Sequence, residues 1–597
     1  MTAEQGRHSV CASIFICGSE KIKNLIFRIQ SLIIDLTGKA GQSCKCRDLF
    51  SDFHEERMVS FAVKYFNTTG VCTPDKHYMV DLKDRMEQIR TMVDAGKYFT
   101  INRARQYGKT TTLTALAHYL QPTYLVIDLD FQDIGDAGFA DENSFSRSFA
   151  IIFSDAVHAQ YGSYGGAFKA ETEELTGFAV RHDGPVSLLD LFRKLQEICA
   201  SADRPIVLMI DEIDSATNNQ VFLDFLAMLR SLYLKREKGR KVSTFHSVIL
   251  AGVTDVKNLK RKIRADDAHR FNSPWNIAAS FNIDMSLPAD GIDGMLREYE
   301  SDHHTGMNTG HLAQVLYDYT GGYPFLVSRL CQIVDQELKG ERFPDLSSAW
   351  TDAGISEAFK RILMEQNTLF ESLMAKVYDN EPLRDILQRI LFGGERIPYN
   401  PDSIPAMDGE MYGFIRNEDG ALAVANRIFE TRLYNYFLSV SEIKDNTVSK
   451  AASRKRDWFI VNGRLDMERL LAHYAVVFDD IYERKTEPFS EEEGRRRFLL
   501  FIRPVINGTG NYYIEARTRN NERMDIVVDY LGERSVIELK IWHGKSYQEK
   551  GEMQLASYLD HYHLNKGYLL TYSFNKDKSP GQRKVVINGK TLVETIV

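Results

Sequence analysis

The stretch Tyr98-Phe-Thr-Ile-Asn-Arg-Ala-Arg-Gln-Tyr-Gly-Lys-Thr110 decides the fold of the first half of the chain. Its first five residues predict a short strand, and the pattern from Gly108 to Leu120 predicts a helix. Gly108 lets the backbone curl tightly, so that successive amide groups face an anion at the positive end of the helix. The sequence therefore predicts a phosphate-binding loop, in which Lys109 reaches the β- and γ-phosphates and Thr110 coordinates Mg²⁺.

A second motif, Ile206-Val-Leu-Met-Ile-Asp-Glu212, is apolar until it ends in two carboxylates. It predicts a buried strand whose Asp211 holds the Mg²⁺ water shell and whose Glu212 polarises the attacking water. Each motif has a simpler explanation, because Gly-Lys-Thr also begins ordinary helices and strand ends often carry solvated carboxylates. Together they favour an ATP-binding domain that uses Mg²⁺.

The flanking sequence alternates between strands and helices, which predicts a mostly parallel α/β sheet. The expected strands are Tyr98–Asn102, Tyr124–Leu129, Pro205–Ile210 and Ser247–Val253, and the expected helices include Gly108–Leu120, Ser187–Ser201 and Val221–Leu234.

These motifs carry a family resemblance. With Arg-x-Arg-x-Tyr-Gly-Lys-Thr, the stretch from Tyr98 to Thr112 resembles the AAA-ATPase-like family of bacterial P-loop proteins, in which arginine typically replaces the first glycine, here Arg103. Thr320-Gly-Gly-Tyr-Pro-Phe325 resembles the Gly-x-Pro motif of STAND-type ATPases. The resemblance spans roughly residues 60–440. It implies a helical lid, in which Pro324 contacts the nucleotide, and then a winged helix.

The resemblance also suggests residues that sense the nucleotide. Thr254, at the end of the strand Ser247–Val253, matches the sensor-1 position, although a polar strand-end cap explains it equally well. Arg264 and Arg270 are candidates for sensing phosphate, against ordinary surface charge.

Residues 307–440 are expected to be mainly helical. A helix over Leu383–Phe392 precedes a candidate hairpin, with strands Met411–Ile415 and Ala421–Ala425 around a turn that contains Asp-Gly. Asn426 could then cap a helix that continues to Tyr436. The basic, polar segment Ser441–Arg456 is expected to be a linker.

The last segment, 457–597, contains a second candidate site. Strands are expected near Tyr512–Arg517, Met524–Tyr530, Ser535–Ile541 and Gly567–Tyr572. In a strand, Glu538 and Lys540 share one face. Gly532-Glu533 forms a turn that makes the two middle strands antiparallel, so Asp525 and Glu538 are expected to meet at one edge and bind a divalent cation. Lys540 would orient the water or neutralise the charge that develops on a phosphate.

This arrangement resembles the PD-(D/E)XK nuclease superfamily, with Met524 in place of the usual proline. Gln554-x-x-x-Tyr558 resembles the signature of its RecB-like branch. The resemblance implies an acidic residue on the first core helix, for which Glu493 fits best and Glu492 second. The alternative is a surface hairpin that carries a Glu–Lys pair. The basic tracts Arg495–Arg497 and Arg517–Arg523 could grip phosphates, although charge runs are usually solvated faces.

Composition narrows the class of protein. The net charge of −8 excludes a generally basic nucleic-acid coat, and 44% hydrophobic residues in 597 suffice for several cores. No apolar run is long enough to span a bilayer, so no membrane partner is expected. Cys11, Cys17, Cys44 and Cys46 are best explained as unrelated reduced thiols rather than a metal site, which favours a cytoplasmic protein.

The expected organisation is an extension (1–60), a P-loop ATPase core (61–300), a helical lid with a winged helix (301–440), a linker (441–456) and an α/β nuclease-like domain (457–597). The expected function is ATP hydrolysis coupled to Mg²⁺-dependent cleavage of nucleic acid, DNA rather than RNA. The alternative is a STAND-like regulatory switch, whose C-terminal domain binds nucleic acid or a partner without cutting. Homo-oligomerisation stays open.

Overall fold

The structure is a computed structural model that describes residues 64–597 except 163–166, 181–183, 254–274, 393–394, 445–446, 483–488, 515–525, 562–563 and 576–580. Several predicted features lie outside the described residues: the extension 1–60, Thr254, Arg264, Arg270, Asp525 and the basic tract 517–523. The side chains of Glu492 and Tyr558 are also outside the description.

The first α/β core is built on a four-stranded parallel sheet in the order β1-β4-β3-β2. All four predicted strands are confirmed within two residues, because strands buried on both faces appear in a sequence as continuous apolar runs. The elements are α4 (Lys83–Asp94), β1 (Tyr98–Asn102), α5 (Lys109–Leu120), β2 (Leu125–Asp130), α6 (Glu142–Tyr161), α7 (Ala167–Val180), α8 (Leu188–Ser201), β3 (Ile206–Asp211), α9 (Gln220–Glu237) and β4 (Ser247–Gly252).

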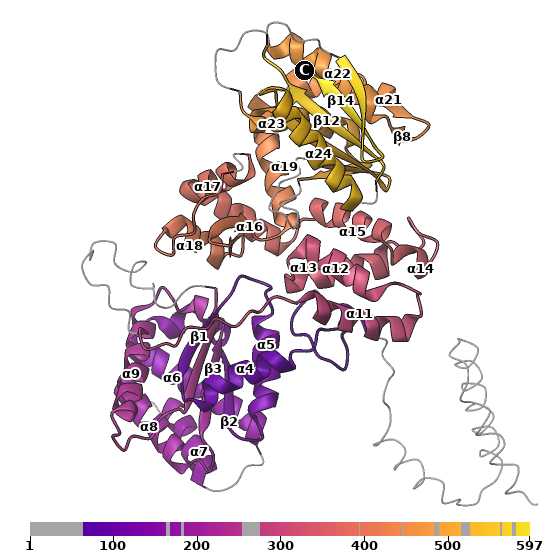
Figure 1. Ribbon diagram of the computed structural model, residues 1–597. Helices are drawn as coiled ribbons and strands as arrows, with labels where there is room; N and C mark the ends of the chain where they lie inside the picture. Colours follow the sequence, from indigo (N-terminus) through magenta and orange to yellow (C-terminus); the bar gives the residue numbers. More distant parts are fainter. Residues whose placement is uncertain are drawn as a thin grey trace, which may run out of the picture. The chain divides into compact units, whose positions relative to one another are not determined.

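Helices cover both faces of this sheet (Figure 1). Side chains of α4 and α5 pack on one face, around Val207, Met209 and Ile249. Side chains of α6, α7, α8 and α9 pack on the other, around Leu208 and Ile210. Because the strands are parallel, their carboxyl ends meet at one edge, and β4 lies between the strand before the loop and the strand that ends in Asp211.

Helices follow the core, as predicted. The lid consists of α11 (Ala289–His303), α12 (Thr309–Thr320), α13 (Pro324–Gln332), α14 (Leu346–Ala349) and α15 (Asp352–Met364). The next elements are α16 (Thr368–Asp379), α17 (Glu381–Leu391), α18 (Ile404–Met411), β5 (Ile415–Glu418), β6 (Ala421–Val424) and α19 (Arg427–Lys444), in the order expected of a winged helix.

The predicted hairpin needs one correction. The strand expected over Met411–Ile415 starts only at Ile415, since α18 continues to Met411. Asp419 and Gly420 form the turn, both with positive φ. Asn426 caps α19, as expected, by accepting a hydrogen bond from the Phe429 amide at 2.9 Å.

The segment expected as a linker, 441–456, is largely helical. It contains the end of α19, the helix α20 (Thr447–Ser453) and the first residue of α21 (Arg456–Phe459). Val448 and Ala452 are buried, and the Ser449 hydroxyl donates to the Leu500 carbonyl at 3.3 Å. The polar residues of this stretch form only the exposed side of a packed helix, which is why composition alone suggested a linker.

The C-terminal domain contains a mixed six-stranded sheet in the order β13-β14-β12-β11-β10-β9. Strands β11, β12 and β14 are parallel, whereas β10 pairs antiparallel with β11, as predicted. The elements are β7 (Ile460–Val461), β8 (Arg464–Leu465), α22 (Met467–Tyr482), α23 (Glu491–Ile506), β9 (Gly510–Tyr513), β10 (Ile526–Tyr530), β11 (Glu533–Ile541), α24 (Lys545–His561), β12 (Lys566–Tyr572), β13 (Gly581–Ile587) and β14 (Lys590–Ile596).

Each face of this sheet has its own helices. Leu555 and Leu559 of α24 pack on the face that carries Val536 and Leu569. Helices α22 and α23 cover the other face, where the Tyr572 hydroxyl donates to the Gly494 carbonyl at 2.9 Å. A Cβ atom at position 494 would lie 2.5 Å from the Tyr572 ring, so only glycine lets α23 approach this closely.

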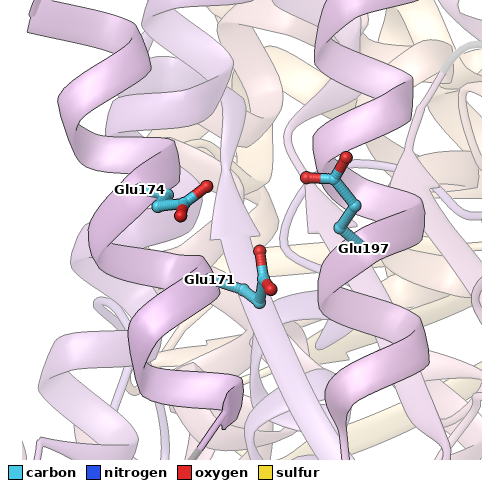
Figure 2. Close-up of side chains that lie close together, drawn as sticks. All are labelled: Glu171, Glu174 and Glu197. Carbon is cyan, nitrogen blue, oxygen red and sulfur yellow. The ribbon is translucent and has the colours of Figure 1, made fainter.

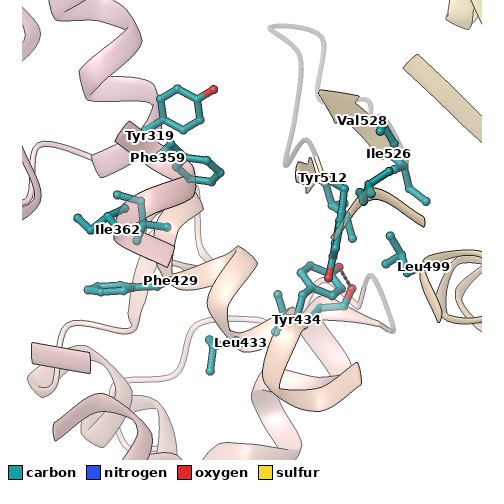
Figure 3. Packing of buried hydrophobic residues seen from close by; sticks show 14 of the residues in the cluster. Tyr319, Phe359, Ile362, Phe429, Leu433, Tyr434, Leu499, Tyr512, Ile526 and Val528 are labelled. Carbon is teal, nitrogen blue, oxygen red and sulfur yellow. Dashed lines mark hydrogen bonds between the residues drawn. The ribbon is translucent and has the colours of Figure 1, made fainter. Parts of the chain in front are cut away.

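One hydrophobic cluster continues from the lid through α19 into the C-terminal domain (Figure 3). It includes Phe359 of α15, Leu433 of α19, Leu499 of α23 and Ile526 of β10. Polar contacts accompany it: the Tyr512 hydroxyl donates to Asn435 of α19 at 2.8 Å.

Every helix in the described part of the chain is too short or too polar to span a lipid bilayer.

Candidate functional site

The predicted phosphate-binding loop connects β1 to α5. Gly108 begins the helix in the left-handed conformation, at φ 77°, which other residues seldom adopt. The Lys109 ammonium is buried and donates to the carbonyls of Arg103 and Ala104, both at 3.1 Å. Burial lowers the pKa of Lys109, an effect that the nearby carboxylates of Glu212 and Asp211 oppose. Its amine is therefore held inside the loop by weak partners that phosphate oxygens could replace.

The two predicted motifs meet at the carboxyl edge of the sheet. The Thr110 hydroxyl donates to Asp211 Oδ2 at 2.7 Å, and Asp211 Oδ1 accepts from the Glu212 amide at 2.8 Å. Glu212 has a φ of 51°, which turns the chain sharply after β3. A hydroxyl and a carboxylate this close supply the hard oxygen donors that Mg²⁺ prefers, so these residues fit the metal.

Arg103, the residue in place of the usual glycine, has its side chain turned toward the neighbouring chain segment. Its guanidinium donates to the carbonyls of Asn102 at 2.8 Å and Ile283 at 2.7 Å, and lies over the Phe281 ring. These contacts hold the loop to the segment that follows the sheet. In this geometry the arginine anchors the loop rather than pointing to the phosphate position.

A pocket of about 380 Å³ lies beside the loop, a volume in the range of ligand sites. Gly108 and Thr111 of the loop line one side, and Pro324 of α13 lies 3.9 Å from the Cβ position of Gly108. Asn67 and Cys72, from the segment before α4, line another side. The predicted Gly-x-Pro motif is thus adjacent to the predicted loop.

Three acidic residues near this edge were not identified in the sequence. Asp128, on β2, has its pKa raised to about 6 by burial, with further contributions from Asp211 and Asp130. Asp214 accepts a hydrogen bond from the Val253 amide at 2.7 Å and thereby ties the end of β4 to the turn after β3. Only strand register, which the sequence does not state, brings Asp128 and Asp130 beside Asp211.

The winged-helix-like region touches the same loop. A Cβ atom at Gly413, between α18 and β5, would lie 2.8 Å from Ala104 Cβ. The Gln106 amide donates to Thr368 of α16 at 3.3 Å, and the Tyr323 hydroxyl donates to the Arg105 carbonyl. The loop is therefore contacted both by Tyr323 of the lid and by elements that follow the lid.

In the C-terminal domain, Glu538 and Lys540 lie on β11 and form an ion pair at 3.0 Å. Glu538 is fully buried, and the Lys540 side chain is 14% exposed. Gly551 of α24 packs against the methylene chain of Lys540, so a larger residue there would displace the lysine. A buried Glu–Lys pair differs from the exposed hairpin pair that was the alternative. Of the two carboxylates predicted to bind a cation, the structure describes only Glu538.

The remaining predicted residues are distributed over two helices. Gln554 lies on α24, three residues after Gly551 and hence one turn along the helix that covers Glu538 and Lys540. Tyr558 also belongs to α24. Glu493 lies on α23 and forms ion pairs with Arg496 and Arg497, both at 2.6 Å. Two residues earlier, Glu491 accepts from the Ile541 amide at the end of β11, at 3.4 Å.

A buried polar network on the same face of the sheet was also missed. Glu594 of β14, 1% exposed, accepts from Gln548 of α24 and from Thr571 of β12, and pairs with Arg583 of β13. Arg583 also pairs with Glu552 of α24 at 3.1 Å, and burial raises the pKa of Glu552. Register places Glu538, Leu569 and Glu594 in one row across three strands, so the network is adjacent to the Glu538–Lys540 pair.

Three glutamates on the core form another acidic group (Figure 2): Glu171 and Glu174 of α7 and Glu197 of α8. Lys194 pairs with Glu174 at 2.8 Å and with Glu197 at 2.7 Å. Since Lys194 already pairs with two of the three carboxylates, the group has the character of a surface ion-pair network.

Comparison with known proteins gives a family match to part of the chain. Residues 192–437 match the model of a family described as an AAA-like domain. This region is similar to an AAA-like domain. It contains Asp211, Glu212 and Pro324 and begins after the predicted phosphate-binding loop. No curated protein gives a significant sequence match to the chain.

Several solved structures have a detectable likeness to the chain. A Walker-type ATPase of Pyrococcus abyssi is 13% identical, with a TM-score of 0.42, over 62% of this chain and 99% of that one. Cdc6p of Pyrobaculum aerophilum is 13% identical, with a TM-score of 0.31, over 62% and 96%. The ORC2 protein of Aeropyrum pernix is 12% identical, with a TM-score of 0.37, over 64% and 97%. We draw no functional conclusion from these likenesses.

Proposed function

We propose that this chain binds and hydrolyses ATP at the loop 103–110 and thereby controls a Mg²⁺-dependent phosphodiesterase site in its C-terminal domain, which acts on DNA. The observation that carries the first half is the contact of Thr110 with Asp211 at 2.7 Å, beside the buried amine of Lys109. It brings two motifs that are far apart in the sequence into one site of matching chemistry. The bounds 61–300, 301–440 and 457–597 are proposed for the three domains, with α20 joining the last.

Each residue of the first site has a role that its position supports. Lys109 would exchange the carbonyls of Arg103 and Ala104 for phosphate oxygens. Thr110 and Asp211 would hold Mg²⁺, which neutralises phosphate charge when bound. Glu212 follows Asp211 directly and would accept a proton from the attacking water; burial raises the pKa of Glu212, which makes its carboxylate a stronger base. Pro324 would close the pocket over the nucleotide, and Thr254 would report on its terminal phosphate.

ATP binding is tested by Lys109→Ala. Because a buried ammonium beside the phosphates has no substitute, we expect a loss of ATP affinity of at least about a hundredfold, as measured by calorimetry with the full chain. Lys97→Ala, which removes an exposed lysine just before β1, is the matched control and should bind ATP normally. Equal ATP affinity in Lys109→Ala and Lys97→Ala would contradict the assignment.

The second half of the proposal rests on the Glu538–Lys540 pair. Burying two opposite charges on one strand costs free energy unless they pair with each other or bind a metal ion. This pair and the helix with Gln554 and Tyr558 support a likeness to PD-(D/E)XK nucleases. In the sequence, Asp525 directly precedes β10. The first residue of β10, Ile526, pairs with Ile537, the neighbour of Glu538. Asp525 and Glu538 would bind Mg²⁺, Lys540 would stabilise charge on the phosphate, and Glu493 or Glu491 would supply the acidic group of the first helix.

Cleavage is tested on the full chain with labelled DNA, in Mg²⁺ and in EDTA. We expect Asp525→Asn and Glu538→Gln each to abolish Mg²⁺-dependent cleavage, because each removes a charged oxygen ligand. Lys540→Met should also suppress it. Glu549→Gln, at an exposed position of α24, is the control and should cleave normally. Cleavage by the Glu538→Gln protein would remove the nuclease proposal.

A second function is favoured by the contact of Gly413 with Ala104. The segment around Gly413, which contacts the loop 103–110, would move when nucleotide binds. The chain would then act as a regulatory switch whose C-terminal domain binds a partner without cutting. ATP-dependent changes in protease protection, in a wild-type protein that cleaves neither DNA nor RNA, would support this function over the first.

A further inference from the structure

A basic patch lies at the start of the C-terminal domain and has no part in either proposed reaction. We define it as Lys450, Arg454, Lys455 and Arg456 together with Trp458. The four basic side chains are exposed, and the sequence from Lys450 to Trp458 contains one acidic residue, Asp457. The whole chain has a net charge of −8, so this patch is a local reversal of charge.

Trp458 is the exposed tryptophan of this patch. Its side chain is 48% exposed, whereas Trp275 and Trp350 are at most 2% exposed. Lys455 Nζ lies 5.6 Å from the ring centroid and Arg469 Cζ lies 5.3 Å from it. The negative face of the exposed ring attracts both cations, so the patch presents an aromatic surface and positive charge together. Its chemistry suits a flat, electron-rich ring attached to an anion.

The backbone holds part of the patch in place. The Arg456 guanidinium donates to the carbonyls of Val505 at 3.1 Å and Asn507 at 2.9 Å, so it supplies a fixed positive charge. Within the described residues, the side chains of Arg454 and Lys455 form no ion pair with a carboxylate. Two side chains are thus available to move onto phosphates.

The winged-helix-like region is a poor alternative contact for nucleic acid. From Asp402 to Gly420, which includes α18 and the hairpin turn, the sequence has five acidic residues and one arginine. Arg416 is paired with Glu418 at 2.7 Å. Gly413 in this segment also packs on the phosphate-binding loop. Acidic surfaces repel the phosphate backbone, which dominates nucleic-acid affinity.

We propose that the basic patch binds single-stranded DNA, with an unpaired base stacked on Trp458 and with Arg454 and Lys455 on the neighbouring phosphates. Stacking requires an unpaired base, and every base offers a face, so the contact is tolerant of sequence. The inference rests on the proposed function, because it gives the DNA substrate a contact outside the Glu538–Lys540 site. Lys450 and Arg456 would add attraction at longer range.

The test uses the full chain and a fluorescent oligothymidylate of about 16 nucleotides, in EDTA to prevent cleavage. Anisotropy gives the affinity, and quenching of intrinsic tryptophan fluorescence reports stacking. We expect Trp458→Ala to weaken binding about tenfold and to abolish most of the quenching, while Trp458→Phe retains most of the affinity. Arg454→Ala/Lys455→Ala should weaken binding and reduce the salt dependence by about 1.4 in log–log slope.

Lys238→Ala/Arg240→Ala removes the same charges from an exposed stretch of the first α/β core and should bind like wild type. Wild-type affinity in Trp458→Ala, or equal effects of the two double variants, would overturn the proposal. The proposal would also be overturned if wild type bound duplex DNA as tightly as the single strand, or if it bound oligouridylate but not oligothymidylate. If wild type cleaves DNA and Trp458→Ala binds the oligonucleotide as wild type does, this inference is wrong but the nuclease proposal is not. Trp458-dependent binding without any cleavage would defeat the nuclease proposal alone.

Discussion

Single residues at the carboxyl edge of the core sheet carry opposing electrostatic effects. Lys109 is buried as a cation, and Asp128, Asp211 and Glu212 surround the same edge. The arrangement suits a ligand that brings both negative phosphates and a divalent cation. Without that ligand, burial makes the charged forms of Lys109, Asp128 and Glu212 unfavourable, and this cost should be measurable in the stability of the free protein.

Asp128 allows this to be measured. Its pKa is raised from 3.8 to about 6, so the folded state binds more protons than the unfolded state between these values. Stability should therefore fall as the pH rises from about 4 to about 6 and stay lowered above. We expect Asp128→Asn to raise the free energy of unfolding at pH 8 by roughly 2 kcal/mol in EDTA, with little gain at pH 4.

Denaturant unfolding at several pH values checks this prediction. The control is Asp133→Asn, at an exposed position after β2, which should change stability little at any pH. A gain from Asp128→Asn that did not depend on pH would mean that the effect comes from packing rather than from the buried charge.

At the scale of elements, the buried polar network of the C-terminal domain determines how β13, β14 and α24 assemble. Glu594 is contacted by Gln548, Thr571 and Arg583, which belong to three different elements. Removal of this carboxylate leaves buried donors unsatisfied.

We expect Glu594→Ala to lower the free energy of unfolding by about 3–5 kcal/mol. Glu549→Ala, exposed on α24, should cost less than about 0.5 kcal/mol in the same thermal or urea melts. Equal melting of the two variants would show that the network contributes nothing to stability.

The sequence was most informative where elements are buried. Strands β1 to β4 were predicted because continuous apolar runs indicate a sheet covered on both faces. Strands β13 and β14 were not predicted: most residues of β13 are exposed and polar, whereas β14 was missed although its middle residues are buried. Helix α20 appeared as a linker for the same reason: seven residues contain little apolar pattern. The start of the hairpin was misplaced because Met411 ends a helix whose apolar residues do not follow one face.

The candidate sites show the same limit. Lys109, Thr110, Asp211 and Glu212 lie in contiguous motifs, so spacing identified them. The network around Glu594 joins it to Thr571 and Gln548, 23 and 46 positions away, and only the tertiary fold brings them together. Arg103 was expected at the nucleotide, but the carbonyl of Ile283, far along the chain, holds its guanidinium.

Over the whole molecule, the lid contacts the C-terminal sheet through buried charge. Asp529 of β10 is 2% exposed and lies 3.3 Å from the Ser356 hydroxyl and 3.6 Å from Lys360 Nζ, both on α15. Lys360 also donates to the Thr509 carbonyl at 3.3 Å. The continuous hydrophobic cluster lies alongside these contacts, so the C-terminal domain and the lid are expected to unfold together.

We expect Lys360→Ala to lower the free energy of unfolding by about 1–3 kcal/mol, because Asp529 stays buried with one cation fewer. Hydrogen exchange should become faster both in α15 and in β10, as measured by mass spectrometry. Lys339→Ala, an exposed lysine of the lid, is the control. Faster exchange confined to α15 would mean that the two parts unfold separately.

Helix α19 has a mechanical consequence. It contacts α12 and α15 of the lid, and also α23 and β9 of the C-terminal domain. Its residues Arg427–Lys444 make a rod about 27 Å long, and an α-helix is stiff along its axis. A tilt of about 10° where Asn426 caps it would displace the far end by about 5 Å, roughly the pitch of one helical turn. A small adjustment beside the predicted phosphate-binding loop, which lines a pocket together with Asn426, would thus reach the C-terminal sheet as a large displacement, with α19 acting as a lever arm.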